Sequence, residues 1–359
     1  MKLTLASAFV LLVGCSNSSH STDMSPVADL ALPEPADMSA TESGAGMDTT
    51  VNIFTNQLFA FDNSGNTREN TATVELPTAG TYAKITLHVA LSCPSKGCDP
   101  YDRVATLGII QPGGDDAGAE NVIEIGRYVT PFGIAGAWDI DVTDLRPLLS
   151  GTVQIHGLID TWVGNGQGWL LTASLVYVGG VPAKIPVAVL PLPWSNFNIG
   201  DPTQPVSQSL PQQTITLPAG ATTAAVRITA TGHGQGNSDN CGEFCTLNHS
   251  LLINNLLEKQ FSVWRDDCAK NPVSPQNGSW QYNRAGWCPG SNVVPNTIDL
   301  GARAGAFQVG YAIDSYVNTC SPGASCNTAT CTLGPSCDYD GSAHTTPYID
   351  FSALVIAYR

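Results

Sequence analysis

Short runs of alternating apolar and polar residues recur along this chain, and they constrain its fold more than any other feature. In residues 82–91 every second residue from Ile85 to Leu91 is apolar, with polar or small residues between them. Strand-like runs follow at 153–160, 169–178, 186–193, 224–231, 307–313 and 348–358. A period of two, with Gly, Pro and Asn between the runs, predicts antiparallel β-sheets. No long amphipathic helix is visible, and the one helix signal is a short capped turn at 141–149.

Length and composition predict an all-β protein of two adjacent antiparallel jelly-roll β-sandwich domains. The chain has 359 residues, and a typical domain holds roughly 100 to 200. Its 35 glycines and 24 prolines suit many short strands and turns, and 43% hydrophobic residues are enough for two cores. The pattern restarts after Gly179-Gly180, so we expect an N-terminal domain at 51–180 and a C-terminal domain at 181–359.

The first fifteen residues have the layout of an export signal. Lys2 provides the positive charge, an apolar stretch follows, and the segment ends in Leu-Val-Gly-Cys15, which resembles the bacterial lipobox. We therefore expect 1–15 to be a lipoprotein signal peptide, Cys15 to carry the lipid, and 16–50 to be a disordered tether. Ser16 favours the outer membrane of a Gram-negative cell. A secreted or periplasmic protein with an ordinary cleaved signal is the alternative.

The cysteine count agrees with export. Eleven cysteines leave an even ten once Cys15 is set aside, which suits disulfides in an oxidising compartment. Four of them, Cys320, Cys326, Cys331 and Cys337, lie in a Gly-, Ser- and Thr-rich insertion at about 316–343. Two disulfides are expected there, with three possible connectivities. A zinc site is the weaker interpretation, because no Cys-x-x-Cys pair is present.

The charge balance limits the partners. Thirty acidic and fifteen basic residues give a net charge of -15, so nucleic acid and anionic membrane surfaces are poor partners. No segment after the first fifteen residues is apolar and long enough to span a bilayer. We expect a monomer that contacts a membrane only through its N-terminal lipid.

Four clusters of distinctive residues lie in the two predicted domains. The first is Cys93-Pro-Ser-Lys-Gly-Cys98-Asp-Pro-Tyr-Asp102-Arg103. The second holds Glu124-Ile-Gly-Arg127 and Asp160-Thr-Trp162. The third contains Thr231-Gly-His233-Gly and Cys241-Gly-Glu243-Phe-Cys245, and the fourth contains Arg284-Ala-Gly-Trp287-Cys288-Pro-Gly290.

Together these motifs resemble the bacterial peptide-N-glycosidase F family, in the same order and over roughly residues 51–359. The resemblance implies two eight-stranded jelly rolls with the active site in the cleft between them, and disulfides Cys93–Cys98, Cys241–Cys245 and Cys268–Cys288. It implies hydrolysis of the β-aspartylglucosamine amide of N-glycosylated proteins or peptides, which converts asparagine to aspartate and releases the glycan. No cofactor or metal is expected.

The same resemblance assigns candidate site residues. Asp102 matches the essential aspartate, and Glu243 and Asp160 match the other two carboxylates. A cluster of carboxylates with shifted pKa values can activate water and protonate a departing amine without metal. Substrate-binding roles are expected for Arg103, Trp162, His233, Arg284 and Trp287. Without the resemblance, Asp102 would be a turn residue, Glu243 an exposed loop acid, and the two tryptophans core residues.

The chain departs from the family at two positions. Asp160 stands where the family has a glutamate, and His233 and Gln235 stand where it has Trp and His. These changes keep open a non-catalytic or weakly active glycan-binding surface protein on the same scaffold. A copper-dependent monooxygenase built from paired jelly rolls is less favoured, since the chain has no His-His or His-x-His and every Met lies in the signal or tether.

Overall fold

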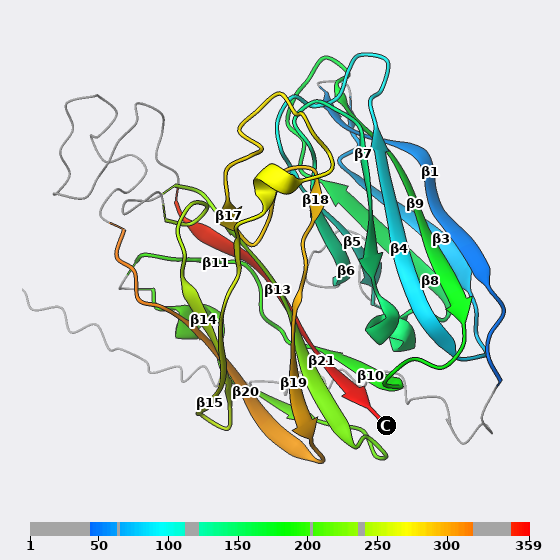
Figure 1. Ribbon diagram of the computed structural model, residues 1–359, viewed down its shortest axis with the longest axis vertical. Helices are drawn as coiled ribbons and strands as arrows, with labels where there is room; N and C mark the ends of the chain where they lie inside the picture. Colours follow the sequence, from blue (N-terminus) through cyan, green and yellow to red (C-terminus); the bar gives the residue numbers. More distant parts are fainter. Residues whose placement is uncertain (1–43, 63–64, 112–121, 202–203, 236–240, 319–345) are drawn as a thin grey trace, which may run out of the picture. The chain divides into compact units, whose positions relative to one another are not determined.

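The computed structural model (Figure 1) describes residues 44–62, 65–111, 122–201, 204–235, 241–318 and 346–359. The expected signal peptide, the lipidated Cys15 and most of the tether lie outside these residues, as do the four cysteines of the insertion. The described residues begin at 44, within the segment expected to be a tether (16–50). Ala45 forms a bridge with Thr81, and the first strand starts at Thr49, because its backbone pairs with the strand that ends the first half.

The predicted all-β architecture is confirmed. The strand-like runs of the first half form two antiparallel sheets, with strand orders β2-β1-β9-β4-β7 and β18-β6-β5-β8-β3. The predicted helical turn at 141–149 is the 3-10 helix η2 (Thr143–Leu148), where the Asp141 carboxylate accepts the Thr143 N–H at 2.9 Å. The strands are β1 (Thr49–Asp62), β2 (Gly65–Asn66), β3 (Glu69–Leu76), β4 (Tyr82–Ser92), β5 (Val104–Ile110), β6 (Val122–Val129), β7 (Gly136–Asp141), β8 (Gly151–Ile159) and β9 (Gly168–Gly179).

The second half forms another pair of antiparallel sheets. Their orders are β10-β21-β13-β19, with β11 beside β21, and β12-β20-β14-β15. The strands are β10 (Pro186–Pro191), β11 (Phe197–Asn198), β12 (Gln213–Thr216), β13 (Thr223–His233), β14 (Asn248–Ile253), β15 (Leu256–Ser262), β16 (Trp264–Arg265), β17 (Arg284–Ala285), β18 (Ser291–Asn292), β19 (Asn296–Ala302), β20 (Ala306–Ile313) and β21 (Tyr348–Tyr358). Two short helices complete this half: α1 (Val206–Ser209) and η3 (Cys268–Lys270). No helix within the described ranges has the length and apolar character needed to cross a membrane.

One strand crosses between the halves. β18 follows the loop that carries Arg284 and Trp287, and it pairs with β6 of the first half through Ser291 and Val129. In Figure 1 the segment that contains β17 and β18 reaches from the second pair of sheets toward the first. This pairing brings the Arg-Ala-Gly-Trp-Cys segment close to first-half residues.

β13 and β21 are buried on both faces. On β13, Ala224, Val226, Ile228 and Ala230 belong to the core of the second half, whereas Ala225 belongs to the core of the first half. On β21, Leu354, Ile356 and Tyr358 likewise pack into the first core, and the alternate residues pack into the second. Because successive side chains point to opposite faces of a strand, both faces of this sheet exclude water. On the face that meets the first half, polar residues replace the apolar ones near Thr231 of β13 and Asp350 of β21.

Arg127 of β6 is the main polar contact between the halves. Its side chain is 2% exposed, and its guanidinium makes four hydrogen bonds and one further ion pair. Nε and Nη2 donate to Glu124 at 3.2 and 2.7 Å, and Nη2 also lies 3.3 Å from the Asp350 carboxylate. Nη1 donates to the Thr231 hydroxyl at 3.0 Å and to the Asp350 carbonyl at 2.6 Å. Both second-half partners come from the strands that are buried on both faces.

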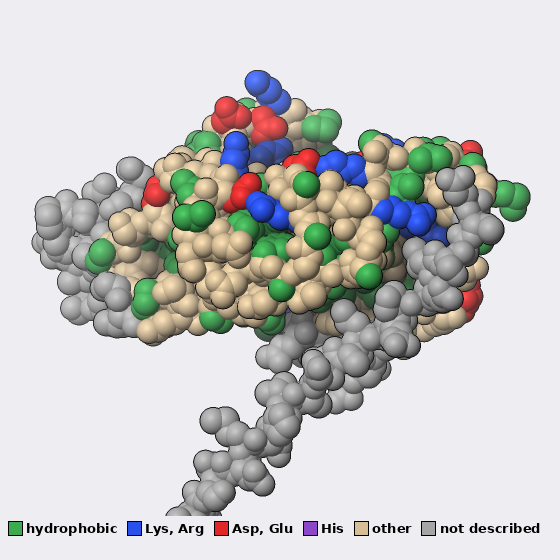
Figure 2. Space-filling model, turned by 90° about the horizontal axis from the view of Figure 1, so that it is seen from below, with side chains coloured by type: hydrophobic (Ala, Val, Ile, Leu, Met, Phe, Trp, Pro, Cys, Tyr) green, Lys and Arg blue, Asp and Glu red, His purple; other side chains and the backbone are tan. Residues whose placement is uncertain are grey.

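Charged groups are mixed on the surface. On the face shown in Figure 2, basic and acidic side chains lie interspersed among polar and apolar ones, and no basic area extends across that face. This agrees with the net charge of -15.

We predict that Arg127→Met destabilises the fold by about 3–5 kcal/mol, because it leaves the carboxylates of Glu124 and Asp350, which are only 13% and 17% exposed, without their cation. Urea unfolding measures the change. The control is Lys184→Met, which removes an ion pair whose two side chains are 44% and 59% exposed and should change stability by less than about 1 kcal/mol. Equal losses in the two variants would contradict a special role for Arg127.

Candidate active site

A cavity of about 330 Å³, lined by both polar and apolar residues, opens beside the Arg127 contact. Residues from both halves line it, because β18 and the face of β13 and β21 hold the halves together there. The lining residues are Asp102, Val104, Val129, His233, Gly234, Glu243, Trp287 and Tyr348. Four of the eight predicted site residues are among them.

The loop that carries Asp102 is held by a buried carboxylate next to it. Asp99 is fully buried and accepts hydrogen bonds from the Tyr101 N–H at 2.9 Å, Arg103 Nε at 2.7 Å and the Thr161 hydroxyl at 2.7 Å. The Cys93–Cys98 disulfide closes the same loop. Arg103 therefore pairs with Asp99, a residue that the sequence analysis did not single out. Three hydrogen bonds on Asp99 fix the backbone from which Asp102 projects.

The loop that carries Glu243 is also tightly fixed. The Cys241–Cys245 disulfide closes it, and its backbone bonds on both sides: the Glu243 N–H donates to Gly234, and the Ala285 N–H donates to the Glu243 carbonyl. Gly242 has a φ of +115°, and a Cβ there would lie 2.6 Å from the His233 carbonyl oxygen. Only glycine allows the loop to lie this close to the end of β13.

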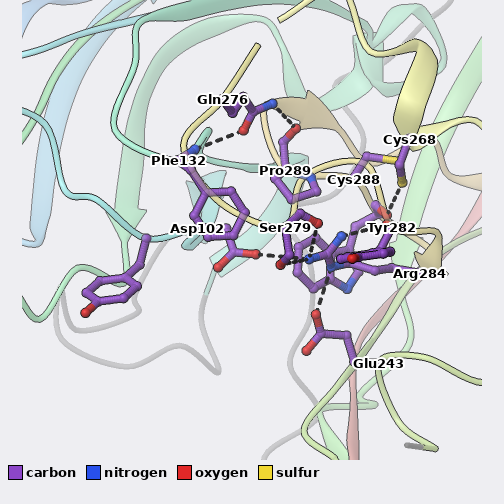
Figure 3. Close-up of polar contacts among 12 residues, drawn as sticks. Asp102, Phe132, Glu243, Cys268, Gln276, Ser279, Tyr282, Arg284, Cys288 and Pro289 are labelled. Carbon is purple, nitrogen blue, oxygen red and sulfur yellow. Dashed lines mark hydrogen bonds and ion pairs between the residues drawn. A yellow bond between two sulfur atoms is a disulfide. The ribbon is translucent and has the colours of Figure 1, made fainter. Parts of the chain in front are cut away.

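Arg284 connects the two carboxylates from opposite halves (Figure 3). It is 1% exposed, Nε donates to Glu243 at 2.8 Å, and Nη2 lies 3.9 Å from the Asp102 carboxylate. Its remaining N–H groups donate to the carbonyls of Tyr282 and Ser279 and to the Ser279 hydroxyl. The pairing of β17 with β16 and the Cys268–Cys288 disulfide hold the segment that carries Arg284. The guanidinium is thus fixed between the acids, with the closer contact to Glu243.

Burial shifts both carboxylates toward their protonated forms. It raises the pKa of Glu243 to about 7, although Arg284 lowers it, and the charge of Asp102 adds to the rise. Burial also raises the pKa of Asp102 above its ordinary value, against the lowering effects of Arg284 and Arg103. Desolvation outweighs the cation in each case, because the cavity wall removes most of the water. At neutral pH the pair can both accept and donate a proton.

Three stacked rings form one wall of the cavity. His233 lies 5.3 Å from both Trp287 and Tyr348, at interplanar angles of 24° and 28°. Trp287 is 4% exposed, its Nε1 donates to the Gly232 carbonyl, and Arg284 lies 4.8 Å from its ring. Trp287 lines the cavity while its ring packs between His233 and Arg284, and its expected substrate-binding role stays a prediction.

Asp160 and Trp162 are not among the residues that line the cavity, although the Asp160 N–H donates at 3.0 Å to the carbonyl of Val104, which does line it. Asp160 is 51% exposed and pairs with Arg68 at 3.1 Å, while Trp162 Nε1 donates to the same carboxylate at 2.8 Å. The Arg68 guanidinium stacks 3.6 Å from the Trp162 ring, and Phe61 packs beside it. Trp162 is still 52% exposed and can present an aromatic surface. Within the described residues, no group of three or more His, Cys, Asp or Glu side chains is arranged to hold a metal ion.

Comparisons with known proteins identify the family. Residues 202–327 match the model of the C-terminal part of peptide-N-glycosidase F. The peptide-N(4)-(N-acetyl-beta-D-glucosaminyl)asparagine amidase F of Elizabethkingia miricola is 30% identical over 310 residues, which is 81% of this chain and 85% of that protein. This chain belongs to the peptide-N-glycosidase F family.

Solved structures share the fold. A recombinant peptide:N-glycanase F superposes with a TM-score of 0.71 and 23% identity, covering 87% of this chain and 95% of the other. PNGase F from Flavobacterium meningosepticum, described as a glycosylasparaginase, gives a TM-score of 0.69 and 24% identity over 87% and 96% of the two chains. The three disulfides implied by the peptide-N-glycosidase F resemblance are also present.

Two further residues of this peptide-N-glycosidase F family member contribute to the site without having been singled out from its sequence. Tyr348 lines the cavity, and Asp99 supports the Asp102 loop. Tyr348 looked like the first residue of an ordinary strand, and only its register opposite His233 places it here. Asp99 stood in the first motif near Asp102, but nothing in its sequence context distinguishes a buried aspartate from an exposed one.

We predict that the Glu243 carboxyl titrates near pH 7, and that Asp102→Asn lowers its midpoint by removing a nearby negative charge. NMR with carboxyl-labelled glutamate measures the midpoint, with Glu243→Gln to assign the signal. The control is Asp160→Asn, whose exposed carboxylate should leave the midpoint unchanged. A midpoint near the ordinary glutamate value of about 4.3 would contradict the cavity electrostatics.

Proposed function

We propose that this protein hydrolyses the amide bond between an asparagine side chain and the first sugar of an N-linked glycan. Membership in the peptide-N-glycosidase F family supports an amidase. The observation that carries the proposal is the Asp102–Arg284–Glu243 bridge, in which two protonation-shifted carboxylates from different halves face one cavity. Such a pair suits a reaction in which one group must lose a proton and another must gain one.

The proposed reaction is a hydrolysis in which one water molecule is consumed. The oxygen of a water molecule attacks the side-chain carbonyl carbon of asparagine, and Asp102 acts at this centre by accepting the water proton. The C–N bond then breaks, and the proton returns to the departing nitrogen. Asparagine becomes aspartate, and the glycan leaves as a glycosylamine. Glu243, with a pKa of about 7, holds the water or the first sugar by accepting or donating a hydrogen bond.

Arg284 has a positioning role in this scheme. It fixes the distance between the acids, and its charge opposes the desolvation that would otherwise protonate both of them. Trp162 and Arg68 offer an exposed planar surface on which a more distant part of the substrate can stack.

We predict that Asp102→Asn abolishes deglycosylation, with a loss of at least roughly 10²-fold, the lower end for a positioned acid or base. The full chain, produced with its disulfides formed, is incubated with an N-glycosylated peptide, and the peptide mass reports conversion of asparagine to aspartate. Asp299→Asn is the control, since Asp299 is 59% exposed and pairs with Lys184. A wild-type protein that binds the glycopeptide but never cleaves it would favour a glycan-binding surface protein.

We also propose that the protein acts outside the cytoplasm, attached through a lipid on Cys15. The Leu-Val-Gly-Cys15 sequence and the three disulfides support this. In a Gram-negative host, Cys15→Ser should remove incorporation of an alkyne-tagged fatty acid and move the protein from the membrane to the soluble fraction. Ser18→Ala should change neither. Labelling that persists in Cys15→Ser would disprove the anchor.

A further inference from the structure

A buried hydroxyl links Arg127 to His233. The Thr231 Oγ1 atom lies 3.0 Å from Arg127 Nη1 and 2.8 Å from His233 Nε2, and Thr231 is fully buried. Arg127 and Thr231 lie behind the cavity wall, whereas His233 lines the cavity. The chain Arg127–Thr231–His233 therefore runs from the contact between the halves to the cavity.

The hydrogens available on Arg127, Thr231 and His233 set the direction of these hydrogen bonds. A guanidinium has no acceptor, so Arg127 donates to the Thr231 oxygen. The Thr231 hydroxyl then has one hydrogen to place, and among the described residues its remaining polar neighbour is His233 Nε2. If His233 donated instead, a buried hydroxyl hydrogen would have no acceptor, which is unfavourable. Thr231 therefore donates to Nε2, and the neutral ring carries its proton on Nδ1.

The Nδ1 atom is available to a ligand. It has no hydrogen-bond partner among the described residues and is not fully enclosed, and His233 lines the cavity; we infer that Nδ1 faces this cavity. Trp287 and Tyr348 stack on the ring and fix its plane. The direction of the Nδ1–H bond is thus set before any ligand arrives.

Burial, more than the surrounding charges, keeps the ring neutral. Burial lowers the pKa of His233 to about 4; Asp350 raises it, and the guanidinium groups of Arg127 and Arg284 lower it. A neutral imidazole with one fixed tautomer offers one donor and no positive charge.

We propose that His233 is a specificity-determining residue that donates a single hydrogen bond from Nδ1 to an acceptor oxygen of the bound saccharide, with Thr231 and Arg127 as the positioning residues that fix its tautomer. The identity of the ligand as a saccharide rests on the proposed function. The tautomer of His233 does not depend on whether the protein is a catalyst.

The tautomer is tested by long-range proton–nitrogen NMR of the full chain labelled with ¹⁵N-histidine. The sequence has six histidines, so His233→Asn assigns the signal by its loss. We expect Nδ1 to be protonated and Nε2 unprotonated from neutral pH down to about pH 5. Thr231→Ser should keep this pattern, and Thr231→Val should shift population toward the Nε2–H form. A wild-type ring protonated on Nε2, or charged at pH 7, would overturn the proposal.

The donor role is tested with a crossed pair of variants and N,N′-diacetylchitobiose as the probe. Asparagine places an amide near the Nδ1 position, whereas phenylalanine keeps a stacked ring without a donor. We expect His233→Asn to bind the disaccharide nearly as well as wild type and His233→Phe to lose roughly 2- to 10-fold in affinity, the range for one hydrogen bond. The opposite order would show that stacking alone matters and would overturn the donor role.

Kinetics separate this proposal from the proposed function. With a cleavable glycopeptide, His233→Phe and Thr231→Val should raise KM while kcat changes less than about twofold, since the lost bond is made in the ground state and the transition state alike. A protein that fails to cleave any glycopeptide, yet binds the disaccharide with a moving Nδ1 signal, would refute the amidase and keep the inference. A protein that cleaves the glycopeptide but whose Nδ1 signal does not change on binding the disaccharide would keep the amidase and refute the inference.

Discussion

The buried Arg127 guanidinium is the interaction on which the arrangement of the two halves depends. Burying a cation is strongly unfavourable unless its donors are satisfied and its charge is paired. Here Glu124, Asp350 and Thr231 accept four hydrogen bonds from the guanidinium, both carboxylates pair with its charge, and the three residues lie on strands from both pairs of sheets. The bonds can form in only one relative placement of β6 against β13 and β21. Apolar packing brings the sheets together, and this contact selects their register.

A second buried guanidinium, that of Arg284, is paired with carboxylates in the same way at the cavity. Arg284 meets Glu243 closely and Asp102 at longer range, so each acid feels both a desolvating wall and a fixed cation. The balance leaves Glu243 poised near neutrality. Because disulfides, strand pairing and the Asp99 cluster fix the surrounding loops, the charges do not need to reorganise when a substrate arrives. Preorganised charges of this kind are the usual source of electrostatic catalysis.

Much of the fold was predictable from the residues. The alternation of apolar and polar residues in 82–91 and 224–231 predicted strands where β4 and β13 lie, because the pleat of a strand repeats every two residues. The family motifs gave the disulfides and placed Asp102, Glu243, His233 and Trp287, all of which line one cavity. Alternation could not reveal that β13 and β21 have a second buried face, nor that β18 joins the sheet of the first half. Those features depend on which surfaces meet.

By itself, the sequence determined the local structure: antiparallel strands, closed disulfide loops, and carboxylates and arginines in recognisable motifs. Only the tertiary structure decided which of those side chains share an environment. It paired Asp160 and Trp162 with Arg68, packed Trp287 between His233 and Arg284, and brought Tyr348 into the cavity lining. The physical reason is that burial and charge pairing depend on neighbours distant along the chain. Pairing a guanidinium with one acid and not another, and shifting a pKa by desolvation, require the packed interface between the halves.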